Sequence, residues 1–356
     1  MSILVITALV AGLTVQPVAG PERWTVDLGS PASSSRMSIV DPDTQILVYR
    51  PRTLRTPANR FTADVDGAAA VDVRGREPDG DWTEWTQAPA VLADPTAVVQ
   101  VRVVFDGPRP TRLTMRADTA AAPLPPRTQA GLTYEIFATR EGLVGGRTAN
   151  GHIIVERDHF VALPTRRGLS MKDTGDYTVK VCATNGRCEW APVWDVGPWN
   201  TRDDYWNPPD VRQMWTDLPQ GRPQAQAAKL DGYNGGLDQF GRVVRNPAGI
   251  DLADGTFWDG LQLTNNSWVT VTFTWTGSGP VGTVRAGEPL NVRTGPGTDA
   301  PVVGLAADLA QIRVECHTAG ERVDGTQGST DLWYRLAPDR WVTAAYVAGA
   351  TEAPAC

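Results

Sequence analysis

Short runs in which apolar and polar residues alternate recur along this chain, separated by turn-forming residues. Val99, Val101 and Val103 alternate with polar neighbours, and the pattern resumes at Leu113 after a Gly-Pro turn. A period of two residues is typical of β-strands that bury one face. Repeated alternation between closely spaced turns therefore predicts a β-sandwich over residues 23–118.

Strand signals continue in a second block, residues 131–276. Stretches that favour strands lie at Thr133–Thr139, Ile153–Glu156, Tyr177–Cys182, Glu189–Trp194 and Trp268–Trp275. Within this block, residues 199–248 form a long polar insertion rich in Gly and Pro, with a short helix expected around Gln224–Leu230. A loop of this length in a compact domain is more often functional than idle.

Two segments rich in turn-forming residues divide the chain into three domains. Residues 119–130 form a Pro/Ala linker, and Gly277–Pro280 forms a second, shorter one. A third, small β unit follows over residues 281–356. The fold class predicted for the whole chain is therefore all-β.

Composition and charge limit the kinds of binding partner that we expect. The 356 residues include 35 Gly and 28 Pro, which favours turns over long helices, and a net charge of −7 without a basic cluster argues against nucleic acid. The apolar run Ile3–Val15, followed by small residues, predicts a signal peptide over residues 1–20, with a buried N-terminal strand as the alternative. After its removal we expect a monomer with no membrane contact.

The four cysteines fit an oxidising compartment. Cys182 and Cys188 flank a hairpin whose loop is Thr184–Gly186, with its glycine in the left-handed position that such loops need. This places the two cysteines directly opposite each other. Cys316 and Cys356 would close a loop over the C-terminal segment. No C-x-x-C pair or His cluster suggests zinc, and we expect no metal and no cofactor.

The C-terminal unit carries an extended motif. Leu290–Gly304 reads L-N-V-R-T-G-P-G-T-D-A-P-V-V-G, and it is followed by W-Y-R-L at Trp333–Leu336 and R-W-V-T-A-A-Y-V at Arg340–Val347. This series resembles a bacterial SH3 domain. The resemblance implies an SH3-like barrel over residues 281–356 that binds cell-wall peptides or glycan, although aromatics such as Trp341 also suit its core.

Four short motifs occur in order in the middle domain, at Arg147–His152, Phe160–Pro164, Trp194–Pro198 and Gly249–Ala253. Together they resemble the double-psi β-barrel of the rare-lipoprotein-A-like family. That family includes glycan-cleaving enzymes and expansin-like wall-loosening proteins. The resemblance implies a double-psi β-barrel over residues 131–276.

Two carboxylates match acidic positions of that family. Asp195 fits its D-x-G-P turn and Asp251 its D-L-S/A segment. Glycosidic cleavage needs a proton donor and a group that stabilises or completes the transition state, and two carboxyl groups with different pKa values can serve. His159 stands one residue out of register with a family histidine and is a third catalytic candidate. The alternatives are a turn-forming role for Asp195 and a cap or barrel-closing hydrogen bond for Asp251.

Aromatic side chains gather after the D-x-G-P turn, and flat rings commonly stack on sugars. The residues expected to bind substrate are Trp194, Trp199, Tyr205, Trp206 and Trp258, with Thr148 and Asn150 from the T-A-x-G motif. The alternative is that these rings fill the core beneath the insertion.

The N-terminal segments Val71–Thr86 and Val98–Phe105 resemble the β-sandwich at the front of some secreted wall amidases and related actinobacterial exoproteins. We read this domain as an accessory module. The expected protein is secreted, associated with the cell wall, and partnered with peptidoglycan or another wall glycan. Three hypotheses stay open: a lytic transglycosylase or glycosidase, a non-catalytic expansin-like module, and an interaction protein whose barrel pocket is filled by residues 199–248.

Overall fold

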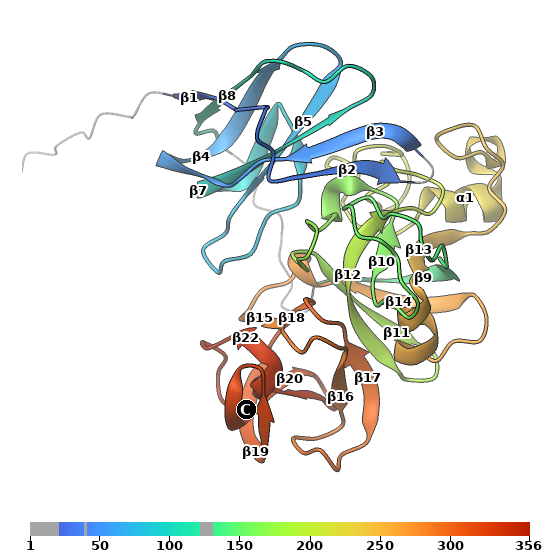
Figure 1. Cartoon of the computed structure of the whole chain (residues 1–356). Coiled ribbons are helices and arrows are strands. Elements are labelled where there is room, and N and C mark those ends of the chain that lie inside the picture. The colour runs from blue at the N-terminus through green and yellow to red at the C-terminus, as the bar shows by residue number, and fades with distance from the viewer. Residues whose placement is uncertain (1–20, 39–40, 122–130) are drawn as a thin grey trace, which may run out of the picture.

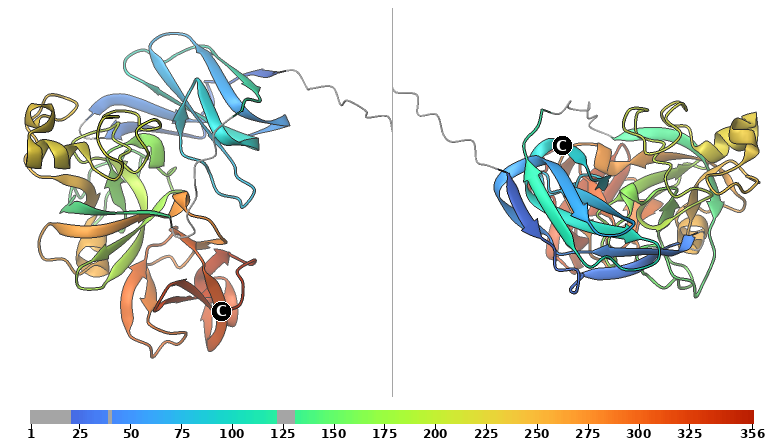
Figure 2. Two further views of the ribbon diagram at one scale, coloured as in Figure 1. Left: turned by 180° about the vertical axis from the view of Figure 1, so that it is seen from behind. Right: turned by 90° about the horizontal axis from the view of Figure 1, so that it is seen from above.

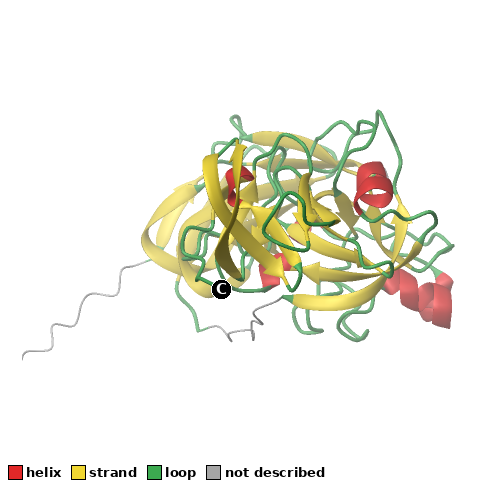
Figure 3. Cartoon of the chain, turned by 90° about the horizontal axis from the view of Figure 1, so that it is seen from below, coloured by secondary structure: helices red, strands yellow, loops and turns green. Residues whose placement is uncertain are grey.

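The computed structural model describes residues 21–38, 41–121 and 131–356 (Figure 1). The predicted signal peptide and residues 122–130 of the linker lie outside the described residues. Strands dominate and helices are short (Figure 3), which confirms the all-β prediction. Within the described part of the chain, no helix is long and apolar enough to cross a membrane.

The N-terminal domain is one continuous sheet of eight strands, in the order β1-β8-β4-β7-β3-β2 with β5 on β7 and β6 on β5. Its strands are β1 (Glu22–Thr25), β2 (Ser33–Ser38), β3 (Asp41–Val48), β4 (Arg52–Val65), β5 (Ala69–Gly75), β6 (Thr86–Gln87), β7 (Ala90–Phe105) and β8 (Leu113–Asp118). The sheet encloses its own core, to which Val99, Val101 and Val103 contribute as predicted. The polar residues between them, Gln100 and Arg102, are also buried.

The middle domain is a closed barrel of six strands, in the order β10-β13-β9-β14-β11-β12 with β12 returning to β10. They are β9 (Leu132–Arg140), β10 (Val161–Leu163), β11 (Thr178–Ala183), β12 (Cys188–Val196), β13 (Ala248–Leu252) and β14 (Ser267–Phe273). The pairs β9–β13 and β10–β12 are parallel. One expected strand is wrong: Ile153 makes only an isolated bridge to Arg147, and Ile153 and Val155 are exposed.

The 199–248 insertion packs as an ordered structure and contains the expected helix, α1 (Gln224–Asp231). Short helical turns complete the domain and its junctions. They are η1 (Arg166–Gly168), η2 (Tyr233–Gly236), η3 (Thr256–Gly260), η4 (Thr274–Thr276) and, in the C-terminal unit, η5 (Ala344–Tyr346).

The C-terminal unit contributes eight more strands, numbered β15 to β22. They are β15 (Val281–Val284), β16 (Leu290–Arg293), β17 (Val302–Ala306), β18 (Gln311–Arg313), β19 (Cys316–Gly325), β20 (Gly328–Ala337), β21 (Arg340–Thr343) and β22 (Val347–Gly349). β17 pairs in parallel with β12, so the unit shares a sheet of eleven strands with the barrel. Gly304 permits this close approach, because a Cβ there would lie 1.9 Å from the Cys188 carbonyl oxygen.

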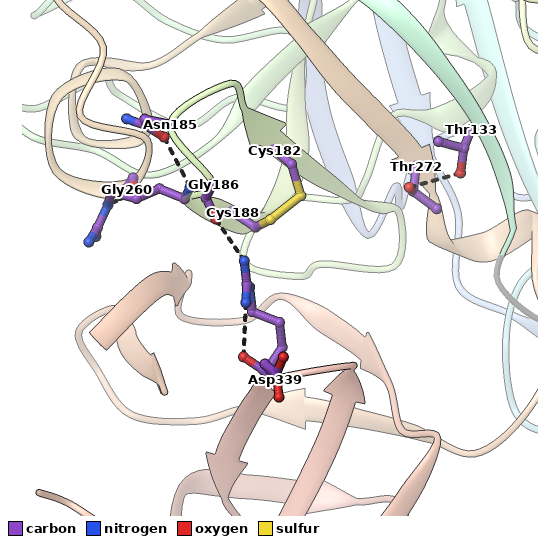
Figure 4. The surroundings of a disulfide bond; sticks show 10 residues. Thr133, Cys182, Asn185, Gly186, Cys188, Gly260, Thr272 and Asp339 are labelled. Atoms are coloured by element: carbon purple, nitrogen blue, oxygen red, sulfur yellow. Dashed lines mark hydrogen bonds between the residues drawn. A yellow bond between two sulfur atoms is a disulfide. The ribbon is translucent and has the colours of Figure 1, made fainter. Parts of the chain in front are cut away.

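Both predicted disulfides are present. Cys182 and Cys188 are direct cross-strand partners on β11 and β12, and the hairpin loop between them holds Gly186 at a φ of 85° (Figure 4). The second disulfide joins Cys316, at the start of β19, to Cys356. All four cysteines are thus bonded as the sequence indicated.

The N-terminal sheet is joined to the barrel by buried charges. Asp72 on β5 accepts from Arg102 at 2.8 Å and from Arg166 of the barrel at 2.9 Å. Burial alone would raise the pKa of Asp72, but Arg166 and Arg102 hold that pKa well below its ordinary value. The guanidinium groups of Arg74 and Arg102 also stack on Trp85, at 4.5 and 4.4 Å from the ring centroid.

Glu84 forms a second junction between the same domains. Its carboxylate accepts from the indole N–H of Trp206 at 2.5 Å and of Trp275 at 2.8 Å, and from the side-chain amide of Asn207 at 2.8 Å. Trp206 belongs to the insertion and stacks on Phe273 of β14, with ring centroids 4.5 Å apart. Figure 1 and the left view of Figure 2 show the barrel lying between the N-terminal sheet and the C-terminal unit.

Substitution Asp72→Ala should destabilise the protein strongly, because it leaves two buried arginines without their carboxylate. We expect a loss of about 3–5 kcal/mol in the free energy of unfolding, measured by urea denaturation at pH 7. The control Asp64→Ala removes an exposed partner of Arg112 and should cost less than about 1 kcal/mol. Since the folded-state pKa of Asp72 is depressed, the difference from wild type should shrink as the pH falls below 3.8. Equal effects of the two variants would contradict this role.

The two disulfides should differ in their contribution to stability. They span sequence separations of 6 and 40 residues. Chain-entropy arguments give about 2 kcal/mol for Cys182–Cys188 and about 4 kcal/mol for Cys316–Cys356. Paired Cys→Ser variants, compared by thermal and denaturant unfolding, should rank in that order, and the reverse order would refute the prediction.

Candidate active site

A row of paired residues crosses the outer wall of the barrel. Ala162, in the middle of β10, pairs with Asp251 of β13 on one side and with Asp195 of β12 on the other. Thr139 of β9 pairs with Asp251 on the far side. Directly paired residues point to the same face of a sheet, so these four side chains lie together. Their chain neighbours Ile250 and Val196 point to the barrel core.

Asp195 reaches this face through an irregularity in β12. Val193 pairs with Val161, whereas Asp195 pairs with the next residue, Ala162, so Trp194 is an extra residue in β12. An extra residue in one strand reverses the direction of the side chains that follow it. Val193 therefore faces the core and Asp195 faces outward, beside Asp251.

The T-A-x-G motif holds the Asp195 carboxylate. Asp195 Oδ1 accepts from the backbone N–H groups of Ala149 and Val196, both at 2.8 Å. The buried Thr148 hydroxyl donates to the side chain of Asn150 at 2.7 Å and braces the motif. Burial raises the pKa of Asp195 to about 6, while contact with Glu141 and the two N–H groups acts against this rise.

Asp251 is the more accessible member of the row and keeps partial exposure to solvent. The Thr139 hydroxyl donates to its Oδ1. Burial of its carboxyl group and then the charge of Asp195 raise the pKa of Asp251 to about 7, against the opposing effect of Thr139. A group with this pKa is partly protonated at neutral pH and can donate a proton.

A third carboxyl group, which the sequence reasoning missed, joins the row. Glu141 follows β9 by one residue, and its N–H donates to the Leu252 carbonyl at 2.8 Å. Both its carboxyl oxygens are buried, and neither meets the geometry of a hydrogen bond to another described residue. Burial, the Asp195 charge and then Asp251 raise its pKa well above the ordinary value. Glu141 lies two residues after Thr139, and this spacing puts both side chains on the same face of the chain. The sequence could have indicated this only if the register of β9 had been known.

Three carboxyl groups in one buried cluster do not all ionise at neutral pH, because each charge raises the pKa of its neighbours. The cluster therefore retains protons under conditions in which isolated Asp and Glu lose them. It can combine a carboxylic acid with a carboxylate, the pair that acid–base chemistry at a glycosidic bond requires.

His159 does not join this cluster. Its Nδ1 lies 3.0 Å from Oε1 of the buried Glu189, which also accepts from the Thr256 hydroxyl at 3.0 Å. Burial alone would lower the pKa of His159, but the Glu189 carboxylate raises it above the ordinary value. The structure thus assigns His159 to an ion pair with Glu189 and gives no support to a catalytic role.

Most of the expected sugar-binding rings are part of the packing. Tyr205 and Trp206 are completely buried, so their expected role in substrate binding is wrong for this conformation: they fill the core beneath the insertion. Trp194 stacks on Phe160 with centroids 5.7 Å apart, and the Trp199 indole N–H donates to Asn246 at 2.9 Å. These contacts give Trp194 and Trp199 structural roles.

Trp258 is the exception, with 40% of its surface exposed. It borders a hollow of about 400 Å³ at the end of β9. The hollow is lined by Arg140, Phe257, Trp258, Thr264, Asn265 and Asn266. Among the described residues, no group of three or more His, Cys, Asp or Glu side chains is arranged to hold a metal ion.

Comparison with known proteins points to the same part of the chain. A family model described as a domain of unknown function (DUF8814) matches residues 132–272. The match begins at the start of β9, includes the insertion and ends within β14, so it is similar to this chain across the barrel domain. No curated protein and no solved structure matches the chain.

The raised pKa of Asp251 predicts a stability cost near neutral pH. A carboxyl group whose pKa rises from 3.8 to about 7 on folding binds its proton more tightly in the folded state, so stability is lost as the pH rises through that interval. Asp251→Asn keeps an acceptor for Thr139 and removes the titration. The variant should be more stable than wild type by up to about 4 kcal/mol at pH 7.5, with the difference shrinking towards pH 4. Thermal unfolding from pH 4 to 8 measures this, and a difference independent of pH would contradict the assignment.

Proposed function

We propose that this protein is exported, associates with the cell wall and cleaves wall glycan at the carboxyl cluster of its barrel. The observation that carries the proposal is the convergence of Asp251, Asp195 and Glu141 on one face. The pKa is raised to about 7 for Asp251, to about 6 for Asp195 and well above its ordinary value for Glu141. Purely structural carboxylates more often pair with cations, as Asp72 does with Arg102 and Arg166.

Asp251 is the proposed general acid. Its protonated carboxyl group donates to the glycosidic oxygen as the bond to the anomeric carbon breaks, and the leaving sugar departs as an alcohol. The resulting Asp251 carboxylate then accepts a proton from the hydroxyl group that attacks the anomeric carbon. In a lytic reaction that hydroxyl belongs to the same sugar and the product is an anhydro ring; in hydrolysis it belongs to water.

The main proposed role of Asp195 and Glu141 is to influence the pH at which Asp251 binds and releases its proton. The Asp195 charge raises the pKa of Asp251, and burial together with the Asp195 charge raises the pKa of Glu141. Asp195 is fixed by two backbone N–H groups, so it remains in place while the proton on Asp251 moves. One carboxylate near the anomeric carbon also suits the positive charge that develops there.

The disulfides and the C-terminal unit support an extracellular setting. Two disulfides are typical of proteins that fold in oxidising compartments. The C-terminal unit, which resembles a bacterial SH3 domain, would hold the protein on the wall. Its pairing with β12 gives the C-terminal unit a fixed position relative to the barrel.

The second candidate is an expansin-like domain that binds glycan without cutting it. It is favoured by the burial of both Glu141 carboxyl oxygens and by the position of the hollow beside Trp258 rather than over the cluster. The third hypothesis, an insertion that fills the barrel site, stays open. The insertion contacts its surroundings through Trp206 with Phe273 and Glu84, among other places. It also packs on β13, where Pro223 lies beside Gly249, two residues before Asp251.

Purified bacterial sacculi incubated with the chain from residue 21 onward provide the test. Mass spectrometry of the supernatant should detect anhydro-muropeptides from the wild type. Asp251→Asn should reduce their release at least about 100-fold, the lower range for loss of a general acid. Glu141→Gln should shift the pH optimum, because it removes a titrating neighbour of Asp251.

The matched control is Asp64→Asn, a change at an exposed carboxylate of the N-terminal sheet that should leave release unchanged. Reducing-end products without anhydro rings would indicate hydrolysis. Pelleting on the sacculi without any release would favour the expansin-like alternative, and absence of both binding and release would refute the wall-glycan proposal.

A further inference from the structure

The two carboxyl oxygens of Asp251 differ in their surroundings. The Thr139 hydroxyl donates to Oδ1. The other oxygen, Oδ2, makes no hydrogen bond within the described part of the chain, yet it is not one of the buried polar atoms that lack a partner. Oδ2 therefore reaches solvent, which agrees with the partial exposure of Asp251. When Asp251 is protonated, Oδ1 accepts from Thr139 and Oδ2 carries the proton.

Gly197 lies directly beside this second oxygen. Strand β12 ends at Val196, but the Gly197 N–H still donates to the Leu163 carbonyl at 3.0 Å and extends the pairing with β10. Because Gly197 follows Asp195 by two residues, a side chain here would point to the same outer face as the carboxyl groups. A Cβ built on Gly197 would lie 3.7 Å from Asp251 Oδ2, which agrees with that direction.

The space in front of Gly197 is otherwise empty. Apart from its two chain neighbours, no further heavy atom of the described residues lies within 4 Å of that Cβ position. At Gly249, by contrast, a Cβ would lie 2.4 Å from the Pro223 ring, and Gly186 is held at a φ of 85°. The φ of Gly197 lies outside the left-handed region. Neither a positive φ nor packing therefore requires a glycine at position 197, whereas a ligand that approaches Asp251 would.

We propose that the glycosidic oxygen reaches Asp251 at Oδ2 through the space that a side chain at position 197 would occupy. The inference rests on the proposed glycan-cleaving function and adds the atom that delivers the proton and the residue that admits the substrate. The proton passes from Oδ2 to the glycosidic oxygen as the bond to the anomeric carbon breaks, so the leaving sugar departs as an alcohol. The hydroxyl group that attacks the anomeric carbon then returns a proton to Oδ2.

Gly197→Ala is the smallest steric probe of this approach. Its methyl group would contact Oδ2 at an ordinary van der Waals distance, so the fold and the raised pKa of Asp251 should be retained. The methyl group would nevertheless hold the glycosidic oxygen away from Oδ2, and a misplacement of about 1 Å can cost about 100-fold in rate. Release of anhydro-muropeptides from sacculi by the chain from residue 21 onward should therefore fall by about 10- to 100-fold.

Gly29→Ala is the matched control. Gly29 is an exposed residue of the N-terminal domain, and a Cβ there would also meet a single aspartate oxygen, Oδ1 of Asp27, at 3.1 Å. It adds the same methyl group in another domain and should leave release unchanged. Thermal unfolding from pH 4 to 8 checks that Gly197→Ala keeps the wild-type dependence of stability on pH, and with it the titration of Asp251.

Carboxyl labelling tests access to Oδ2 without any assumption about catalysis. A water-soluble carbodiimide with glycine ethyl ester converts carboxyl groups that reach solvent into amides, which peptide mass spectrometry locates. In the wild type, Asp251 should be labelled, whereas Glu141, whose carboxyl oxygens are both buried, should not. Gly197→Ala should reduce labelling of Asp251 and leave that of the exposed Asp64 unchanged. A wild-type Asp251 that resists labelling would overturn the proposed approach and favour an insertion that fills the barrel site.

The release assay separates failure of this inference from failure of the proposed function. Wild-type release by Gly197→Ala, together with loss of release in Asp251→Asn, would overturn the inference and leave the glycan-cleaving function standing. Absence of release from the wild type would refute the proposed function, and the admission of a glycan at Gly197 with it, whatever the labelling shows.

Discussion

The barrel depends on β10, a strand of only three residues that pairs with both β12 and β13. The strand pairing that closes the barrel also places Asp251 and Asp195 on either side of Ala162. Closing the barrel therefore brings the two carboxyl groups together. The alanine matters in its own right. Its methyl group is small, so the carboxyl groups on either side face each other directly. A larger side chain would lie between the two carboxyl groups and weaken their electrostatic interaction. The Asp195 charge, which adds to burial in raising the pKa of Asp251, therefore acts through the register of one short strand.

The three domains are joined too closely to act as separate modules. The C-terminal unit continues the barrel sheet through β17, and Trp190 of β12 packs in the core of that unit. The N-terminal domain contributes Trp85 to the core of the barrel and a carboxylate, Asp72, to the buried Arg166 of the barrel. Buried ion pairs are costly to form, but they hold two domains in one relative position, because separating the pair leaves a buried charge without its partner. The C-terminal unit and the carboxyl cluster, attached in this way, keep a constant orientation to each other.

The sequence predicted the features that depend on local pattern. The alternation at Val99–Val103, the hairpin around Gly186, both disulfides and the helix at Gln224–Leu230 are all confirmed, because each follows from neighbouring residues. What it missed depends on partners far away in the chain. Gln100 and Arg102 look like the solvent face of a strand and are buried because the barrel covers them. Tyr205 and Trp206 look like sugar-binding rings and are core, while Glu141 joins Asp195 and Asp251 only through the pairing of β9 with β13.

The extra residue in β12 has a genetic consequence. Loss of the single codon for Trp194 would restore regular pairing and leave Asp195 opposite Ala162, on the same face as Asp251. Such a deletion would remove the ring that stacks on Phe160 and leave the length of every loop unchanged. A lineage could thus lose the bulge in one step and keep the acidic pair. Among descendants of this barrel, the pairing of Asp195 with Ala162 would report the presence of the acidic pair more faithfully than the spacing between Val193 and Asp195.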